Sequence, residues 1–219
     1  MNGLADFWNS YGTQIIQALG PHLYLTGVSL LIGVVIAVPL GIILTRFPRW
    51  ASPIIAVVSI FQTIPSLVFF ALVLPYLGIG ERPALTVLSL YSLLPILRNT
   101  YVGLRSVDAT LIDAARGQGM TSWEILYMVE LPLAAPVIVA GIRLSAVYLV
   151  SWATIAALIG AGGLGELIFS GIDSYDTSLL LAGAIPAALL ALAVGFLFGI
   201  VRRLVTPRGL KTEVSKRWI

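Results

Sequence analysis

The sequence predicts an all-α, polytopic membrane protein with five transmembrane helices. Hydrophobic residues make up 58% of the 219 residues, charged residues only 11%, and the mean hydropathy is +0.99. A soluble domain, by contrast, carries roughly 25% charged residues. Apolar segments long enough to cross about 30 Å of hydrocarbon recur along the chain. Basic residues concentrate in alternate links between these segments, which is the charge pattern of a polytopic membrane protein.

Residues 1–20 predict an amphipathic helix at a surface. Phe7, Trp8, Tyr11 and Ile15 recur at helical spacing, and polar residues such as Gln14 lie opposite them. The pattern does not distinguish between two locations for this helix. It lies either in the membrane–water interface, where aromatic residues are favoured, or against the protein's own outer face.

The transmembrane segments follow in order, and several contain proline. Pro39 is expected to kink the first span, whereas Pro65 and Pro75 fall inside the second. Arg98 lies near the end of the third. The predicted spans cover about residues 23–44, 51–77, 84–104, 133–159 and 179–201.

Charge bias predicts the orientation. If the basic tail, residues 203–219, is cytoplasmic, then Arg46, Arg49 and Arg116 are inside as well, and Asp173 and Asp176 are outside. This arrangement satisfies the positive-inside rule. We therefore expect the N-terminus outside and the C-terminus inside.

The link at residues 106–132 predicts a helix–turn–helix on the cytoplasmic side. Ser106 is expected to cap the first helix, with Asp108 in its first turn. Gly119, with Gly117 just before it, is expected to end that helix. Thr121 and Glu124 have the spacing of a capping box for a second short helix. We expect its residues Trp123, Leu126 and Tyr127 to share one face, and Pro132 to close it.

This link resembles the EAA motif of type I ATP-binding cassette (ABC) importer permeases. That motif reads Glu-Ala-Ala, three residues, Gly, nine residues, Ile, one residue, Leu-Pro. Every spacing matches here, with Asp in place of Glu and Val in place of Ile. The matching residues are Asp113, Ala114, Ala115, Gly119, Val129, Leu131 and Pro132.

The resemblance implies a type I permease core over residues 21–202 with a cytoplasmic coupling helix. Its ATPase-coupling residues would be Asp113, Ala114, Ala115, Gly119, Leu131 and Pro132. The implied partners are a cytoplasmic ATP-binding subunit, a substrate-binding protein and a second permease, either another copy of this chain or a paralogue. The chain has no phosphate-binding loop. We therefore expect no cofactor in this chain, with ATP and Mg²⁺ bound by the partner ATPase.

A second resemblance points to a solute class. Residues 156–165, AALIGAGGLG, with Arg143, residues 62–67, QTIPSL, and residues 98–100, RNT, are similar to permeases for glycine betaine, carnitine and choline. The methionine-importer permeases share part of the glycine pattern, so a methionine-type amino acid is the alternative solute. The same glycines fit the dinucleotide motif GxGxxG, but a long apolar helix is predicted before them where that motif needs a strand. We interpret them as a compact turn that ends the fourth span.

Polar and aromatic residues within the spans are candidates for the solute pathway. Aromatic faces suit a quaternary ammonium ion, which has no hydrogen-bond donor. The alternative is that the same groups only pack helices together. The candidates are Gln62, Thr63, Ser66, Tyr148, Ser151 and Trp152.

We expect three further residues to have structural roles. Arg98 and Arg143 are expected to snorkel or to pair with acids such as Glu130 or Asp108. His22 is expected to be an interfacial residue at a helix start.

Other function classes find little support. The chain has no cysteine and one histidine, which excludes cysteine-based and histidine-cluster metal sites. An intramembrane enzyme would need paired carboxylates, a Ser/Lys dyad or a His cluster at membrane depth, and none is predicted. The net charge of +3 is interpreted as membrane orientation and not as nucleic-acid binding. We therefore expect a non-enzymatic, multi-pass protein of the bacterial inner membrane, in contact with lipid.

Overall fold

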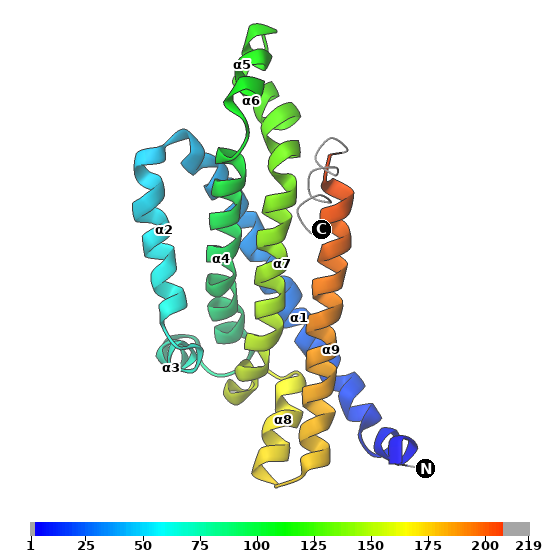
Figure 1. The fold of residues 1–219 in the computed structure, drawn as a ribbon. Helices are drawn as coiled ribbons and strands as arrows, with labels where there is room; N and C mark the ends of the chain where they lie inside the picture. Colours follow the sequence, from blue (N-terminus) through cyan, green and yellow to red (C-terminus); the bar gives the residue numbers. More distant parts are fainter. Residues whose placement is uncertain (1–2, 208–219) are drawn as a thin grey trace.

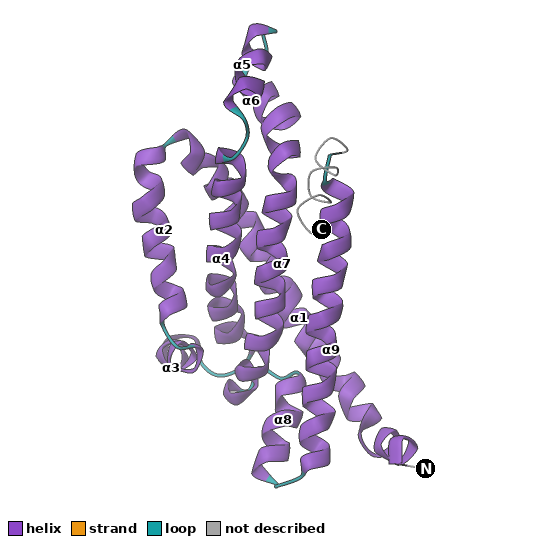
Figure 2. Cartoon of the chain, viewed as in Figure 1, coloured by secondary structure: helices purple, strands orange, loops and turns teal. Residues whose placement is uncertain are grey.

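The protein is a bundle of long helices (Figures 1 and 2). The structure is a computed structural model that describes residues 3–207, with side chains from residue 6 onward. No strand occurs within that range. The helices are α1 (Gly3–Arg46), α2 (Pro48–Thr63), α3 (Ser66–Leu77), α4 (Glu81–Arg105), α5 (Ala109–Gly117), α6 (Ser122–Ile125), α7 (Leu131–Ala156), α8 (Leu164–Asp173) and α9 (Thr177–Val205), with a π-helical turn, η1 (Leu126–Glu130), before α7 and a 3-10 turn, η2 (Ala157–Ile159), after it.

Helix α4 lies at the centre of the bundle. It packs against α1, α2, α3 and α7, and α7 packs in turn against α9. Helices α5 and α6 project beyond the bundle at one end, which we call the loop end; α3 and α8 lie at the opposite end (Figure 1). The largest core cluster includes Leu25, Phe70, Leu88 and Leu149, which come from α1, α3, α4 and α7.

Hydropathy separates the helices into two groups. The helices formed by residues 6–46, 122–159 and 177–205 are long and apolar enough to cross a membrane. Helix α4 has 25 residues but a more polar composition. Its buried Thr100 and Ser92 hydroxyls donate to Ile96 O and Ser89 O over 2.8 and 2.6 Å, and Ser145 of α7 donates to Ser92 O over 3.1 Å. Other helices surround α4, and the bonded Thr100 and Ser92 hydroxyls make their burial tolerable, whereas the buried Ser89 hydroxyl has no partner.

The second predicted span, residues 51–77, is not one helix. It is broken into α2 and α3, which meet at 94°. Pro65, at the break, has no N–H to donate and disfavours a helical conformation in the residue before it; Ile64 accordingly has extended backbone, with φ −73° and ψ 125°. The other prolines inside helices, Pro39 among them, do not interrupt the assigned helix.

The boundary predicted near residue 20 is not a break in the backbone. Helix α1 runs without interruption from Gly3 to Arg46. Ile15 and Ala18 are buried with Leu164 and Ala182 of α8 and α9. This part of α1 therefore packs on the protein itself, which was one of the two predicted positions. The predicted tail, residues 203–219, lies outside the described residues from position 208 onward.

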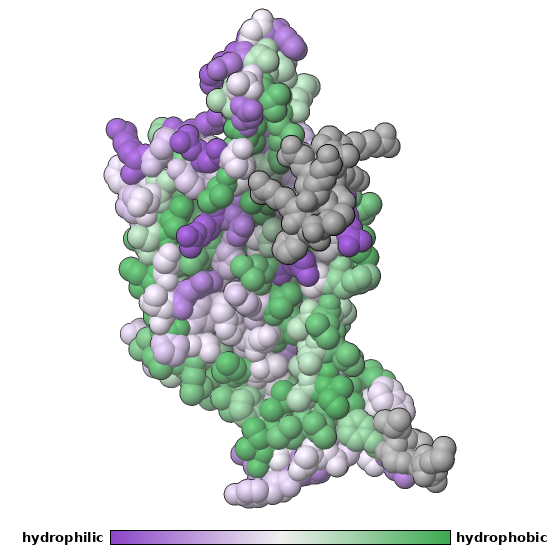
Figure 3. All heavy atoms as spheres, viewed as in Figure 1, coloured by the Kyte–Doolittle hydropathy of each residue, from purple (hydrophilic) through white to green (hydrophobic). Residues whose placement is uncertain are grey.

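The surface is divided by polarity. In the space-filling view, hydrophilic residues gather around α5 and α6 and the upper rim of the bundle, whereas apolar residues dominate below (Figure 3). On α9, Leu189, Leu192 and Phe196 are exposed. Large exposed apolar areas are unusual on soluble monomers and are ordinary for helices whose solvent is lipid.

We predict that Gly33→Ala destabilises the fold, because a Cβ at Gly33 would come within 2.8 Å of Ser92 Cβ where α1 crosses α4. Over-packing of this kind costs about 1–3 kcal/mol in the free energy of unfolding. Thermal denaturation of the detergent-solubilised protein measures the effect. Gly27→Ala in the same helix is the matched control, because a Cβ there has nothing within 4 Å. Equal melting temperatures for the two variants would contradict the close α1–α4 packing.

Candidate functional site

The link with the predicted coupling residues forms a protrusion at the loop end. Helices α5 and α6 extend beyond the other helices (Figure 1). Asp108, and not Ser106, caps α5: Asp108 Oδ1 accepts from the Thr110 N–H over 2.9 Å. Ser106 instead donates to Gly103 O at the end of α4. The bond from the Thr110 N–H lowers the pKa of Asp108 below its ordinary value, because it stabilises the ionised form.

A glycine turn separates the two helices of the protrusion, as predicted. Helix α5 ends at Gly117, and Gly119 has φ +84°. The Met120 N–H then donates back to Ala115 O over 3.2 Å. A residue with a side chain rarely adopts this left-handed conformation, so Gly119 fixes the direction of the turn.

The predicted capping box is present at the start of α6. The Thr121 side chain accepts from the Glu124 N–H, and Glu124 Oε2 accepts from the Thr121 N–H over 2.6 Å. The start of α6 therefore has two of its backbone donors bonded.

The second helix of the protrusion does not close at Pro132. Helix α6 continues through η1 into α7, and the Leu131 N–H donates to Leu126 O, five residues back. The wider π turn allows the helix to continue past a proline, because the hydrogen bonding adjusts locally. One continuous helical rod therefore joins the protrusion to the interior of the bundle.

The expected common face of Trp123, Leu126 and Tyr127 is not present. Leu126 is 5% exposed and packs with Leu104 and Ala134, whereas Trp123 and Tyr127 are 68% and 64% exposed. The two aromatic rings stack with centroids 5.8 Å apart. They form an exposed aromatic surface on the protrusion.

The predicted coupling residues divide into two places. Asp113, Ala114 and Ala115 lie on α5, and Gly119 lies in the turn after it, so these four are brought together. Asp113 and Ala114 are exposed, Ala115 is buried, and Asp113 accepts from Arg116 over 3.1 Å. Leu131 and Pro132 lie apart from them, at the start of α7.

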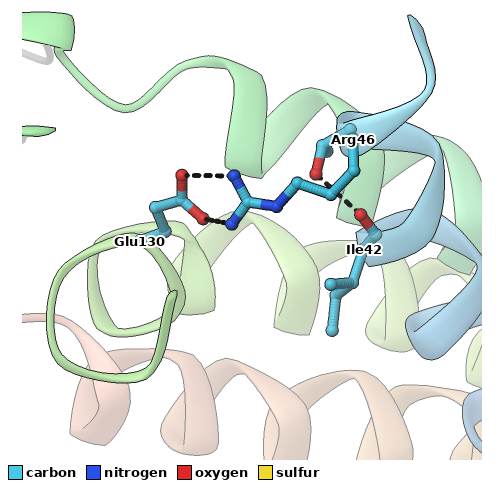
Figure 4. A network of polar contacts seen from close by, with 4 residues as sticks. Ile42, Arg46 and Glu130 are labelled. Atoms are coloured by element: carbon cyan, nitrogen blue, oxygen red, sulfur yellow. Dashed lines mark hydrogen bonds and ion pairs between the residues drawn. The ribbon is translucent and has the colours of Figure 1, made fainter. Parts of the chain in front are cut away.

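An ion pair that the sequence did not predict joins the base of the protrusion to α1. Arg46 Nη1 donates to Glu130 Oε1 over 3.2 Å, and Nη2 donates to Oε2 over 2.5 Å (Figure 4). The Glu130 side chain is 7% exposed and that of Arg46 is 42% exposed. Glu130 therefore pairs with Arg46 and not with Arg98 or Arg143, and snorkelling stays a prediction for those two arginines. The sequence shows that a basic residue directly follows the first span. It does not indicate that the acidic partner of this residue lies 84 residues later.

The solute-pathway candidates lie around the α2–α3 break and on α7. Gln62 Nε2 donates to Tyr91 O over 3.1 Å, and Tyr91 Oη donates to Ile64 O over 2.7 Å. Thr63 is exposed and donates to Ile60 O within its own helix. Ser66 begins α3 and is half-buried. Tyr91, which the sequence analysis missed, therefore holds the break together from α4.

Tyr91 also links the two groups of candidates through its ring. The Tyr148 and Trp152 rings of α7 lie 5.4 Å apart between centroids, as their spacing predicted. Trp152 lies 4.6 Å from Tyr91, and Tyr91 lies 5.5 Å from Phe69 of α3. We call these four residues the aromatic row. Ser151, beside it on α7, is exposed.

His22 and the glycine turn after α7 form a packed structural unit. His22 is buried inside α1, not interfacial at a helix start, and its Nε2 lies 3.1 Å from Val150 O. Gly160, Gly162 and Gly163 have φ between +75° and +91°. A helix, not a strand, precedes them, so the local structure does not fit a dinucleotide site.

Within the described residues no group of His, Asp or Glu could hold a metal ion.

Comparison with known proteins gives one consistent family. The family described as "Binding-protein-dependent transport system inner membrane component" matches residues 37–210. The carnitine transport permease protein OpuCB of Listeria monocytogenes is 46% identical over 96% of this chain and 97% of that protein. The glycine betaine/carnitine/choline transport system permease protein OpuCB of Bacillus subtilis is 44% identical over 98% of this chain and all of that protein. The choline transport system permease protein OpuBB of the same species is 43% identical over 96% of this chain and 97% of that protein.

Solved structures show a shared fold. A chain in the structure of the MetNI methionine ABC transporter in inward-facing conformations superposes with a TM-score of 0.80 at 24% identity, over 88% of this chain and 96% of that chain. A second crystal form of the same transporter gives a TM-score of 0.77 at 26% identity.

We predict that Arg46→Met lowers the free energy of unfolding by about 1–3 kcal/mol, because it leaves the Glu130 carboxylate buried without its partner. The value is below the roughly 3–5 kcal/mol of a fully buried pair because Arg46 is partly exposed. Glu130→Gln should cost less, since an amide can still accept from Arg46.

Thermal denaturation of the single variants and of Arg46→Met with Glu130→Leu provides the test. The double variant should recover most of the loss, because it removes the buried charge with its partner. A double variant no more stable than Arg46→Met would contradict the role of this ion pair.

Proposed function

The chain belongs to the family of binding-protein-dependent transport system inner membrane components, and on that premise we propose that it is the permease subunit of an ATP-driven importer for a quaternary-ammonium osmoprotectant. Glycine betaine, carnitine and choline are the solutes named for its relatives. The observation that carries the proposal is the extent of the match: the chain is 43–46% identical to these permeases over at least 96% of its length. The family is one of transport, and an intramembrane enzyme has no support from it.

Methionine is the weaker choice of solute. The likeness to the methionine transporter is one of fold, at 24–26% identity, and a shared fold does not determine a substrate. The relatives of higher identity carry osmoprotectants in their names.

The proposed topology has five crossings, with the N-terminus outside and the C-terminus inside a bacterial plasma membrane. Helices α1, α7 and α9 supply three crossings, and α4 and the bent α2–α3 pair supply the others. The bent pair is supported by its internally bonded break, because irregular backbone is tolerated in a membrane only where it is buried or lines a cavity. Basic residues at the loop end support the orientation; they include Arg46, Arg49, Arg105, Arg116, Arg202 and Arg203.

The proposed domain division follows this topology. Residues 21–202 form the transmembrane core, preceded by the amphipathic segment 1–20 and followed by the cytoplasmic tail 203–219. The continuity of α1 across residue 20 makes the first boundary one of environment and not of backbone structure.

The protrusion is the proposed docking element for a cytoplasmic ATPase. Its support is shape and surface: α5 and the turn at Gly119 stand clear of the bundle, with Asp113 and Ala114 exposed beside them. Closure of an ATPase dimer, which would bind the ATP and Mg²⁺, moves the two protrusions of a permease pair together. The continuous rod of α6, η1 and α7 carries that movement into the bundle, and the Arg46–Glu130 pair extends it to α1. Leu131 and Pro132 act at the base of the rod.

The proposed solute pathway runs along the aromatic row beside the α2–α3 break. Tyr148 is 42% exposed and Ser151 is exposed, so both are accessible, whereas Tyr91 and Phe69 are buried behind them. Trp152, between Tyr148 and Tyr91, presents a face that attracts a cation. Gln62, Thr63 and Ser66 supply polar groups at the break. A substrate-binding protein on the outer side would deliver the solute, and a second permease, a copy or a paralogue, would complete the pathway.

We predict that Gly119→Asp leaves the protein inserted in the membrane but abolishes co-purification with the ATPase and solute uptake. The substitution adds both a side chain to a residue with φ +84° and a charge to the docking surface. Gly117→Ala is the matched control, because a Cβ there meets nothing within 4 Å and the backbone is ordinary. Normal uptake by Gly119→Asp would exclude the docking role.

We predict that Trp152→Leu reduces betaine uptake without dissociating the complex, whereas Trp152→Phe retains most of it. Loss of one cation–π contact of about 0.5–2 kcal/mol corresponds to a roughly 2–30-fold loss in transport efficiency. Uptake of labelled betaine, choline and methionine by the reconstituted complex measures the effect and identifies the solute. Trp8→Leu, in an exposed residue at the start of α1, is the control. Equal kinetics for Trp152→Leu and the unaltered protein would remove Trp152 from the pathway.

A further inference from the structure

A groove between α7 and α9 is not used by the proposed transport function. It has a volume of about 600 Å³ and lies along the last turns of α9. This volume is within the range of small-molecule sites, about 300–1,000 Å³. Arg143 of α7 and Arg202 and Arg203 of α9 all line it.

Helical register explains how the groove forms. Gly195, Gly199 and Arg202 recur at four- and three-residue spacing, so they lie on one face of α9. A Cβ built on Gly199 or Gly195 would be 3.9 Å from a guanidinium nitrogen of Arg143. The Arg143 guanidinium therefore lies over the glycine face of α9.

The groove has charge of one sign. Among residues 6–207, none of Arg143, Arg202 and Arg203 forms a salt bridge with a carboxylate. Guanidinium groups pair bidentately with phosphate and carboxylate, and clustered arginines attract anions.

The groove also has an apolar part. Phe196 and Ile200 line it and are 71% and 40% exposed. They precede Arg202 and Arg203 on α9 by about half a turn to two turns, toward the middle of the apolar helix. Charge at the end of the span and apolar surface toward its middle match the polarity of a phospholipid in the adjacent leaflet. A free inorganic anion would have no use for the apolar part.

We propose that this groove binds an anionic phospholipid such as phosphatidylglycerol. Arg143, Arg202 and Arg203 contact the head-group phosphate, and an acyl chain lies along Phe196 and Ile200. Basic pockets between transmembrane helices on the cytoplasmic side bind anionic head groups in this way. The leaflet named here, the cytoplasmic one, rests on the proposed topology, whereas the site itself rests on the groove.

The test is native mass spectrometry of the assembled transporter, released from detergent and titrated with phosphatidylglycerol or phosphatidylcholine. We expect selective retention of phosphatidylglycerol. Replacement of Arg143, Arg202 and Arg203 by Gln should weaken it by about fivefold for each arginine. Replacement of all three by Lys should retain part of the affinity, because charge remains without the bidentate geometry. Arg49→Gln, an exposed arginine at the start of α2, should change nothing.

Three outcomes would overturn the proposal. Equal retention of phosphatidylcholine would exclude recognition of charge, and unchanged binding by the triple Gln variant would exclude these arginines. Full displacement of phosphatidylglycerol by inorganic phosphate at millimolar concentration would mean that the groove is a free-anion site. If the triple Gln variant does not fold, the single Arg143→Gln variant tests the loss of one charge, and the triple Lys variant tests the loss of bidentate geometry. Lipid binding is read without transport, so a complex that binds lipid but does not import betaine would count against the proposed function alone.

Discussion

A backbone carbonyl or amide inside a bilayer has to find its hydrogen-bond partner within the protein, because lipid offers none. Helices meet this requirement internally, and in the proposed topology the α2–α3 break meets it with tertiary contacts. The Tyr91 hydroxyl bonds Ile64 O, and Gln62 bonds the backbone of Tyr91 in return. The break therefore requires α4 beside it. Helix α4 is itself enclosed chiefly by α1 and α7, and it is the least apolar of the long helices.

The connection between the protrusion and the bundle depends on a second local feature, the π turn at residues 126–130. Pro132, which cannot donate a backbone hydrogen bond, lies just after this turn. With this turn, α6 and α7 form one rod, and Glu130 on the turn binds Arg46 at the end of α1. The protrusion is thus joined to α1 and α7, two of the four helices that pack on α4.

Arginines at the loop end have different partners, and the difference has a physical cause. Arg46 faces a nearly buried carboxylate, whose desolvation is offset by the pairing. Arg143 lies over the glycine face of α9, in a groove lined by two further arginines. The protein itself supplies the anion that pairs with Arg46. At the Arg143 groove, the proposed anion is a phospholipid of the surrounding membrane. In the proposed topology, the positive-inside bias thereby also creates a surface suited to anionic lipid.

By itself the sequence determined the helical class, the positions of most long helices, the capping box, the left-handed turn at Gly119 and the family. These depend on local periodicity, capping chemistry and spacing, which are written within a few residues of one another. Only the tertiary structure decided the 94° break, the rod through Pro132, the Arg46–Glu130 pair and the position of Tyr91 in the aromatic row. Each of these features either joins residues from different helices or depends on how the backbone around a proline is hydrogen-bonded. Hydrophobic periodicity specifies neither the contacts between helices nor the backbone around a proline.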